Sequence, residues 1–428
     1  MIKLGNHKGW LYLPVEIKVR ELDAKLLLAY YAVKEGYRVI IGEHRMVELA
    51  SATYPNGIFF SKGYPKGFRK RIITNAKNNG HMIVELDEEG LILSNTTQYL
   101  DDRMRSEMLE LVTQEYCWGE FQKETITKVT QEFASKCHIV GHPRFDLLKS
   151  KFQPFYEKEV EDIRKKYHDF VLINTRFTLY NSITEKKNQN TDELTLYIKR
   201  LYDYFLNLIK DVCVRFPDTN FVVRPHPGEN INAYRETFSQ HHNVHVIHEG
   251  SIVKWLMAAK VIIQNGCTSS IEAFLVGSPI ISYIPVTSKE FDVEFPNELG
   301  FKAKNKHEVN NILKNILNKH SADHLYKQHV IESEKYLNQY YEWSNEEFSY
   351  VEILRLLSTI KLTPSSRRLS SSQKTFYLKE NKKVKHFFPS LTNTEIVHFF
   401  SKLNEVEKSN SGFIIKKLGK NLYDIYQK

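Results

Sequence analysis

Hydrophobic and polar positions at the start of the chain predict a strand, a helix and a second strand. Residues 10–15 form a short apolar run, and apolar residues recur at helical spacing over 18–35, where Gly36 follows. Residues 37–41 form the next apolar run. Because a strand–helix–strand unit most simply builds a parallel sheet, this pattern predicts an α/β protein.

The same pattern returns along the chain and divides it into two halves. Further apolar runs, each followed by a polar loop, lie at 81–86, 137–142, 169–177, 220–227, 243–250, 260–266 and 278–285. Two series of this kind predict a GT-B-like arrangement of two Rossmann-like domains, with parallel sheets facing a central cleft. We expect an N-terminal domain at 1–155, a C-terminal domain at 156–345, a crossover helix at 346–362 and an extension at 363–428.

The expected extension begins with a linker and continues as a small, mostly helical module. Residues 363–374 are rich in Ser and basic residues, which is typical of a linker. Thr392 and Glu395 have the spacing of a capping box before a helical pattern. Ser344 and Glu347 have the same spacing and predict a helix that runs to about Ser358.

Composition narrows the class of protein. The 428 residues are 42% hydrophobic and 26% charged, as in soluble globular proteins. We find no signal peptide and no apolar run of the roughly 18 residues that a membrane-spanning helix needs. The four cysteines are scattered without a CxxC pair, which indicates reduced thiols in a cytosolic protein rather than a disulfide frame or a zinc site.

Positive charge is concentrated near the end of the sequence. The net charge is +9, and residues 363–428 hold 13 Lys and Arg against 5 Asp and Glu, or +8. A basic tail favours contact with an anionic surface such as a membrane, and a solvated face is the alternative. The near-neutral body argues against a nucleic-acid-binding protein.

The stretch FVVRPHPGEN places a cation and an imidazole directly after a strand. Ligands of open α/β sheets bind outside the carboxyl ends of strands, so Arg224 and His226 are candidates for anion binding. Pro225 and Pro227 fix φ on either side of His226 and stiffen it. Arg and His are suitable donors to a phosphate or a carboxylate. A packed turn with a structural histidine is the alternative.

A second candidate loop follows the strand at 261–264. Asn265 and Gly266 form a turn, and hydroxyl side chains then open a helix, where free N–H groups favour phosphate. The hydroxyl residues are Thr268, Ser269 and Ser270. Glu272 in the first helical turn is placed to accept ribose hydroxyls. A capped helix without a ligand is the alternative.

Adjacent carboxylates mark a third loop. Asp87, Glu88 and Glu89 precede Gly90 at the end of a strand, and their mutual repulsion raises the proton affinity of at least one of them. Such a carboxylate is a candidate general base toward an acceptor hydroxyl. A solvated acidic turn is the alternative.

Other polar groups at strand ends are weaker candidates. Glu16, Arg20 and Glu21 lie near the first helix start and either contact an acceptor or cap the helix. Asn174 and Thr175 end the first strand of the second half and are candidates for donor contact. We predict no metal site, since the histidines of 241–248 have no carboxylate partner and lie on both strand faces. The absence of GxGxxG argues against a nicotinamide or flavin cofactor.

These motifs together resemble a known family. The chain, over about residues 10–360, resembles the bacterial surface carbohydrate biosynthesis proteins, a group of GT-B glycosyltransferases. More loosely it resembles the sialyl-, polysialyl- and Kdo-transferases that use CMP-activated sugars. The matching stretches are LDEEG, VGHPRFDLL, INTRF, RPHP and NGCTSSIEA. In this chain the acidic, His-Pro and Ser/Thr motifs of that family correspond to Glu88-Glu89-Gly90, His226-Pro227 and Thr268-Ser269-Ser270.

The resemblance implies a cytosolic transferase that needs no metal and no cofactor. The N-terminal domain would bind a glycan or glycolipid acceptor and supply the base. The C-terminal domain would hold a CMP-activated ulosonic acid of the Kdo, sialic, legionaminic or pseudaminic type. The basic tail lies outside the resemblance and is a separate hypothesis for contact with the inner face of the cytoplasmic membrane. The alternatives are a CDP-polyol phosphotransferase, a UDP-GlcNAc 2-epimerase-like enzyme and a non-enzymatic anionic-surface binding protein.

Overall fold

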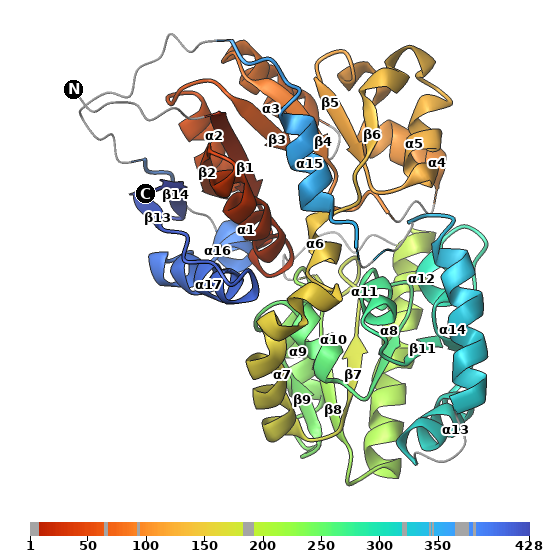
Figure 1. Ribbon diagram of the computed structural model, residues 1–428. Coiled ribbons are helices and arrows are strands. Elements are labelled where there is room, and N and C mark those ends of the chain that lie inside the picture. Colours follow the sequence, from red (N-terminus) through yellow and green to blue (C-terminus); the bar gives the residue numbers. More distant parts are fainter. Residues whose placement is uncertain are drawn as a thin grey trace. The chain divides into compact units, whose positions relative to one another are not determined.

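The computed structural model of the chain contains two compact units, each organised around its own sheet (Figure 1). The first unit comprises residues 1–155 and 339–428, and the second comprises 156–338. The structure describes residues 8–63, 67–91, 95–182, 192–318, 323–341, 344, 346–363, 376–379 and 382–428. Among these residues no helix combines the length and the apolar character needed to cross a bilayer.

Eight strands form the sheet of the first unit. They are β1 (Gly9–Val15), β2 (Tyr37–Glu43), β3 (Ile58–Ser61), β4 (Met82–Leu86), β5 (Gln114–Cys117), β6 (Cys137–Ile139), β13 (Phe413–Gly419) and β14 (Leu422–Gln427). Their order is β13-β14-β2-β1-β3-β4-β5-β6. Strands β1 to β6 are parallel, whereas β14 is antiparallel to β2 and to β13. The direction of winding therefore reverses between β1 and β3, which is where ligands bind in open α/β sheets.

Helices and short helical turns connect these strands. They are α1 (Lys18–Lys34), α2 (His44–Ser51), α3 (Phe68–Asn78), α4 (Thr96–Tyr99), η1 (Leu100–Met104), η2 (Ser106–Met108), α5 (Glu120–Thr127), η3 (Gln131–Lys136), α6 (Pro143–Asp146), η4 (Ser150–Phe152), α15 (Ser349–Leu357), α16 (Lys382–Phe387) and α17 (Asn393–Val406). Helix α7 (Gln153–Tyr167) spans the boundary between the units. Helix α1 is the most buried of the long helices, because it packs on the sheet, on α6 and on α17.

The C-terminal extension belongs to the first unit instead of forming a separate module. Its helices are present, and Thr392 and Glu395 form the predicted capping box. The hairpin β13–β14, which the mostly helical expectation for this extension did not include, adds two strands to the sheet at β2. Arg38 on β2 makes a bidentate ion pair with Asp424 on β14, with Nε 2.8 Å from Oδ1. Most of the predicted linker (364–374) lies outside the described residues.

The capping box predicted at Ser344 does not open a helix. The Ser344 hydroxyl accepts the N–H groups of Glu346 and Glu347, but α15 begins only at Ser349, with Phe348 as its N-cap. A carboxylate distant in sequence caps this helix instead. Asp146 accepts the N–H groups of Ser349 and Tyr350, each at 2.9 Å.

Six parallel strands form the sheet of the second unit. They are β7 (Phe170–Asn174), β8 (Asn220–Arg224), β9 (Val244–Val246), β10 (Val261–Gln264), β11 (Ile280–Tyr283) and β12 (Phe301–Ala303). The spatial order is β12-β11-β10-β7-β8-β9. Numbered from β7, this is the 3-2-1-4-5-6 order of Rossmann folds, and its switch point lies between β7 and β10. The helices are α8 (Glu193–Arg215), α9 (Ile231–Thr237), α10 (Ile252–Ala258), α11 (Ser269–Leu275), α12 (Glu294–Glu298), α13 (Lys306–Leu317) and α14 (Asp323–Leu337).

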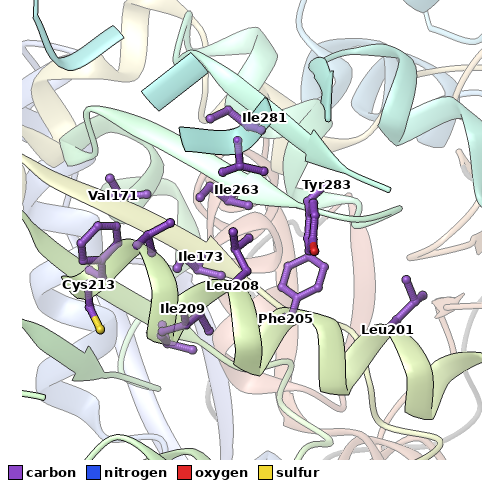
Figure 2. Close-up of a cluster of buried hydrophobic side chains, with 14 of the residues drawn as sticks. Val171, Ile173, Leu201, Phe205, Leu208, Ile209, Cys213, Ile263, Ile281 and Tyr283 are labelled. Atoms are coloured by element: carbon purple, nitrogen blue, oxygen red, sulfur yellow. The ribbon is translucent and has the colours of Figure 1, made fainter. Parts of the chain in front are cut away.

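Burial of apolar side chains between α8 and the sheet holds the second unit together. Asp192 starts α8 by accepting the N–H of Thr195 at 2.7 Å. Apolar residues then recur on one face of the helix and point toward the strands (Figure 2). Phe205 meets Tyr283 with ring centroids 5.3 Å apart. This packing fixes the strands whose carboxyl ends carry the candidate site.

Candidate functional site

The strand order brings together several predicted residues of the second unit. Asn174 ends β7, Thr175 follows it, and Asn265 follows β10, so these residues flank the switch point. His226 follows β8, the other neighbour of β7. The sequence predicted these positions as strand ends, but only the strand order shows that the three loops are neighbours.

His226 is held in a defined tautomer. Its Nδ1 accepts the N–H of Gly228 at 3.1 Å and lies 3.0 Å from the Thr178 hydroxyl. Because Nδ1 is an acceptor, the neutral ring carries its proton on Nε2, which is therefore a hydrogen-bond donor. The side chain is half-buried and Pro227 beside it is also half-buried. A fixed Nε2–H donor at a strand end is suited to a phosphate oxygen.

Arg224 does not form the predicted cation–imidazole pair. Its guanidinium donates to the carbonyl oxygens of Glu249 (2.8 Å) and Gly250 (2.9 Å) and lies over the Trp255 ring. The residue is 9% exposed, and burial lowers the pKa of the guanidinium to about 10. At least two of its donors therefore hold the loop after β9, and anion binding by Arg224 stays a prediction.

Glu229, which was not among the predicted site residues, stabilises the RPHP turn through its side-chain carboxylate. Its carboxylate accepts the Thr175 hydroxyl (2.8 Å), the backbone N–H of His226 (3.0 Å) and the Tyr234 hydroxyl (2.5 Å). Burial raises the pKa of Glu229. Thr175 is buried in this network, so its hydroxyl stabilises the turn and not the predicted donor contact.

The hydroxyl-rich loop after β10 is partly used by the fold itself. The Ser270 hydroxyl donates to the carbonyls of Cys267 (2.9 Å) and Pro296 (3.0 Å), and the Gly266 N–H donates to Asn297. Ser269 accepts from the Asn174 amide at 2.8 Å. Thr268 is half-buried and is the hydroxyl of this loop best placed for a ligand.

The structure also bears on two other predictions for this loop, the phosphate site at the start of α11 and the role of Glu272. Helix α11 has only seven residues, which weakens the predicted phosphate seat at its start. Glu272 is only 3% exposed in the first turn of α11, and its contact with ribose hydroxyls stays a prediction. Sequence patterns could not reveal this burial, since an acidic residue in a first turn is usually exposed.

Arg176 is a cation at the switch point that the sequence analysis did not select. Its Nε donates to the carbonyl of Asn265 at 2.6 Å, and its Nη2 donates to Asn265 Oδ1 at 3.0 Å. The residue is half-buried. The stretch NTRF was the available signal, because a cation two residues after a buried strand lies at the ligand edge.

In the first unit, Glu88 is a buried structural carboxylate. It lies 2.8 Å from Lys25 Nζ and 3.3 Å from His142 Nε2, and all three residues are buried. Burial alone would raise the pKa of Glu88, but Lys25 and His142 outweigh it and hold the pKa well below its ordinary value. The rise in proton affinity expected for at least one of the three acids does not occur at Glu88, which is therefore not suited to be the base.

Asp87 and Glu89 share one arginine. Arg103 contacts Asp87 through Nε at 3.0 Å and through Nη2 at 2.5 Å, and its Nη1 lies 3.1 Å from Glu89. Asp87 is buried and accepts the N–H of Glu89 at 2.9 Å. Glu89 is 42% exposed and also meets Arg20 at 2.6 Å. Glu89 is thus the acid of this motif that is most accessible to a substrate.

Glu16, Arg20 and Glu21 lie near the acidic motif, at the reversal between β1 and β3. Glu21 caps the start of α1 by accepting the N–H groups of Glu16 (2.8 Å) and Ile17 (3.2 Å). It also pairs with Lys62, which follows β3, at 2.9 Å. Lys62 contacts Glu16 at 3.1 Å. Capping, the alternative for this cluster, is correct for Glu21, whereas Glu16 and Arg20 remain predicted acceptor contacts.

Among the residues that the structure describes, no group of three or more His, Cys, Asp or Glu side chains could hold a metal ion. His245 of the histidine-rich stretch instead contacts Asn220 Oδ1 at 2.9 Å.

The two Rossmann-like units with parallel sheets define a fold of the GT-B class. No protein-family model and no curated protein matches the sequence. Among solved structures, the chain is similar to the MnaA protein of S. aureus, solved with UDP, at 13% identity and a TM-score of 0.52 over 81% of this chain and 94% of that one. It is also similar to a Listeria monocytogenes protein provisionally assigned as a UDP-N-acetylglucosamine 2-epimerase. That match has 14% identity and a TM-score of 0.50, over 82% of this chain and 95% of the other. At these identities the similarity establishes the fold.

Proposed function

We propose that the protein is a metal-independent glycosyltransferase that moves a ulosonic acid of the Kdo, sialic, legionaminic or pseudaminic type from CMP to a surface polysaccharide or lipopolysaccharide acceptor. The observation that supports it most is the geometry of His226. Its Nδ1 is occupied by the Gly228 N–H, so Nε2 is a donor at a strand end beside the switch point. A donor fixed before the substrate arrives can stabilise charge that develops on a leaving phosphate.

The reaction assigns one role to each unit. The acceptor oxygen forms a bond to the anomeric carbon of the donor sugar while the bond from that carbon to the CMP oxygen breaks. CMP leaves with the bonding electron pair, and His226 stabilises the negative charge on its phosphate. Glu89 takes the proton of the acceptor hydroxyl as general base. We assign the base to Glu89 because Glu88 and Asp87 are buried and committed to Lys25 and Arg103.

A second candidate function is a UDP-GlcNAc 2-epimerase-like activity. Two observations favour it: the S. aureus structure contains UDP, and the Listeria protein is assigned as a UDP-N-acetylglucosamine 2-epimerase. The two functions differ in the nucleotide and in the need for an acceptor. An epimerase acts on UDP-GlcNAc alone, whereas the transferase requires a second substrate.

The decisive experiment incubates the full-length chain with a panel of CMP-ulosonic acids, with and without glycan acceptors, and with UDP-GlcNAc alone. We expect CMP release that depends on the acceptor, together with a product heavier by one sugar. Acceptor-independent conversion of UDP-GlcNAc, with no CMP release, would replace the transferase by the epimerase.

A substitution of Glu89 tests the catalytic assignment. Glu89→Gln should lower turnover about 10²- to 10⁴-fold while CMP binding is retained, because a general base contributes on that order. The matched control is Glu124→Gln, which neutralises an exposed carboxylate on α5 of the same unit. Full activity of Glu89→Gln would show that the base is elsewhere.

The location at the inner face of the membrane rests on the basic extension. Deleting 363–428 would remove β14 from the sheet, so charge substitutions are the cleaner test. Lys382, Lys383 and Lys385 are exposed on α16. Their joint replacement by Gln should weaken association with anionic liposomes, at about 1 kcal/mol per lysine near the surface. Unchanged co-sedimentation would exclude docking through α16.

A further inference from the structure

Arg176 lies two residues after β7, and hydrogen bonds to Asn265 and to the Tyr197 side chain hold its guanidinium. Its Nε and Nη2 donate to the carbonyl and the side-chain oxygen of Asn265, the residue that follows β10. This fork spans the switch point between the two neighbouring strands. A guanidinium has five N–H donors, so some remain for another acceptor after the two bonds to Asn265 and the contact with Tyr197.

No carboxylate neutralises this guanidinium within the described part of the chain. Its hydrogen bonds go to Asn265 and to the Tyr197 side chain, and no ion pair joins it directly to an acid there. Burial lowers the pKa of Arg176 below its ordinary value, although Tyr197, Cys267 and Asp292 attract its charge. Asp292 accepts the Tyr197 hydroxyl instead. A partly buried cation without a paired anion is unfavourable, and a bound anion would remove that cost.

Neighbouring groups shape a cradle around the guanidinium. Asn174 is 4% exposed and its Oδ1 has no hydrogen-bond partner, so the same strand end contains a buried, unused acceptor. Gly266 has φ of +56°, and a Cβ there would lie 2.9 Å from Arg176 Nε. Only glycine therefore allows the loop to approach the guanidinium this closely.

We infer that Arg176 binds the phosphate of the nucleotide in the second unit, with Asn265 as its positioning residue. The inference rests on the proposed function in so far as a nucleotide binds there. A guanidinium held by two hydrogen bonds presents its remaining donors to phosphate oxygens in a fixed plane. Asn174 Oδ1 accepts a hydroxyl of the same ligand.

Isothermal titration of the full-length chain tests this assignment with CMP, cytidine, UDP and uridine as probes. Arg176→Gln should lower CMP affinity about 10- to 100-fold, the range for a hydrogen bond to a charged group, and leave cytidine affinity within about twofold. The CMP affinity of Arg176→Lys should lie between that of the wild type and that of Arg176→Gln. The matched control Arg200→Gln removes the same charge from the exposed face of α8 and should bind CMP like the wild type.

The comparison of probes separates this inference from the proposed function. If the wild type prefers UDP to CMP and Arg176→Gln weakens UDP but not uridine, the phosphate assignment is supported while the CMP donor is not. Equal loss for nucleotide and nucleoside would mean that Arg176 only maintains the loop, and the inference fails. It also fails if CMP affinity is unchanged, or if the wild type binds neither nucleotide. Should Arg176→Gln not fold, Arg176→Lys decides, with binding of CMP expected to weaken relative to cytidine.

Discussion

Each unit contains a His-Pro turn after a strand, and the two turns differ in what surrounds the imidazole. His142 follows β6 and His226 follows β8, and in both Nδ1 accepts the backbone N–H two residues later, at 3.1 Å. Both neutral rings therefore carry the proton on Nε2. His142 is fully buried, with Nε2 3.3 Å from Glu88 and its ring stacked on Trp118 at 4.3 Å. His226 is half-buried at a ligand edge.

The comparison separates what local sequence determines from what tertiary structure determines. A His-Pro turn sets the tautomer by a contact within three residues. Whether the Nε2 donor then stabilises the fold or binds a ligand depends on residues distant in sequence. His142 meets Glu88, whose charge is also compensated by Lys25. The burial of His142 indicates a role in the stability of the first unit, whereas nucleotide binding is the role that we propose for His226.

The largest expected effect concerns the carboxylate that faces His142. Lys25→Met leaves Glu88 buried without its ammonium partner and should lower the free energy of unfolding by about 3–5 kcal/mol. Urea unfolding followed by circular dichroism measures it. The double variant with Glu88→Leu removes both charges and should recover most of the loss. A change below about 1 kcal/mol for Lys25→Met alone would show that this pair is not structural.

Next in size is the loss of the buried imidazole. His142→Ala removes a ring stacked in the core and should lower the free energy of unfolding by about 2–4 kcal/mol, while CMP affinity stays within twofold. Thermal unfolding and calorimetric titration report the two quantities. Weaker CMP binding without a stability change would reverse the roles assigned to the two histidines.

His226→Ala is the corresponding substitution in the second unit. CMP affinity should fall about 10- to 100-fold because a donor to a charged phosphate is lost, while the free energy of unfolding changes by less than about 1 kcal/mol. His226→Asn, which retains a polar side chain without the imidazole Nε2, should not restore binding. If the alanine variant binds CMP like the wild type, His226 is a structural turn residue, as the alternative for RPHP holds.

Acid should affect the His142 region through Glu88. The Glu88 pKa is lowered on folding, so its contribution to stability is complete above the ordinary value of 4.5 and is lost as pH falls through the folded-state pKa. The difference in unfolding free energy between wild type and Glu88→Gln should shrink below pH 4.5, by at most about 1.4 kcal/mol per pH unit. A difference that is constant between pH 6 and the acid limit would contradict the lowered pKa.

The smallest effect is expected from Thr178, whose hydroxyl lies 3.0 Å from His226 Nδ1. Thr178→Val removes one of two contacts to Nδ1 and leaves that from Gly228. CMP affinity should fall about 2- to 5-fold, as for a neutral hydrogen bond. Thr237→Val, which removes an α9 hydroxyl that bonds Ala233, is the matched control. An effect as large as that of His226→Ala would mean that Thr178 itself contacts the ligand.

The periodicity of hydrophobic residues predicted the α/β layers of the fold but not which strands pair with one another. Buried runs such as 261–264 identify a parallel sheet, because these strands are covered on both faces. The order of the strands depends on contacts between distant segments and cannot be read from one pattern. The hairpin β13–β14 did leave a signal: Lys420 and Asn421 form a two-residue turn between alternating stretches, and Asn421 has a φ of 59°. The pairing of this hairpin with β2 left no such signal in the sequence.

For the candidate site too, local sequence predicted which residues lie at strand ends but not which contacts their side chains make. His226 and Glu89 were selected from local sequence, and both are accessible at strand ends. Arg224 was selected by the same argument and is buried on carbonyl oxygens, while Arg176 was passed over. A position at a strand end is a property of the sequence, whereas the direction in which a long side chain finds its partners is a property of the folded unit.

The most direct test of the account is a crystal structure of the full-length protein with CMP. The account predicts the CMP phosphate within hydrogen-bonding distance of His226 Nε2, at the carboxyl edge of β7 and β8, with His142 still buried against Glu88. CMP bound in the second unit with its phosphate away from His226, or bound instead at the His142 turn, would contradict it.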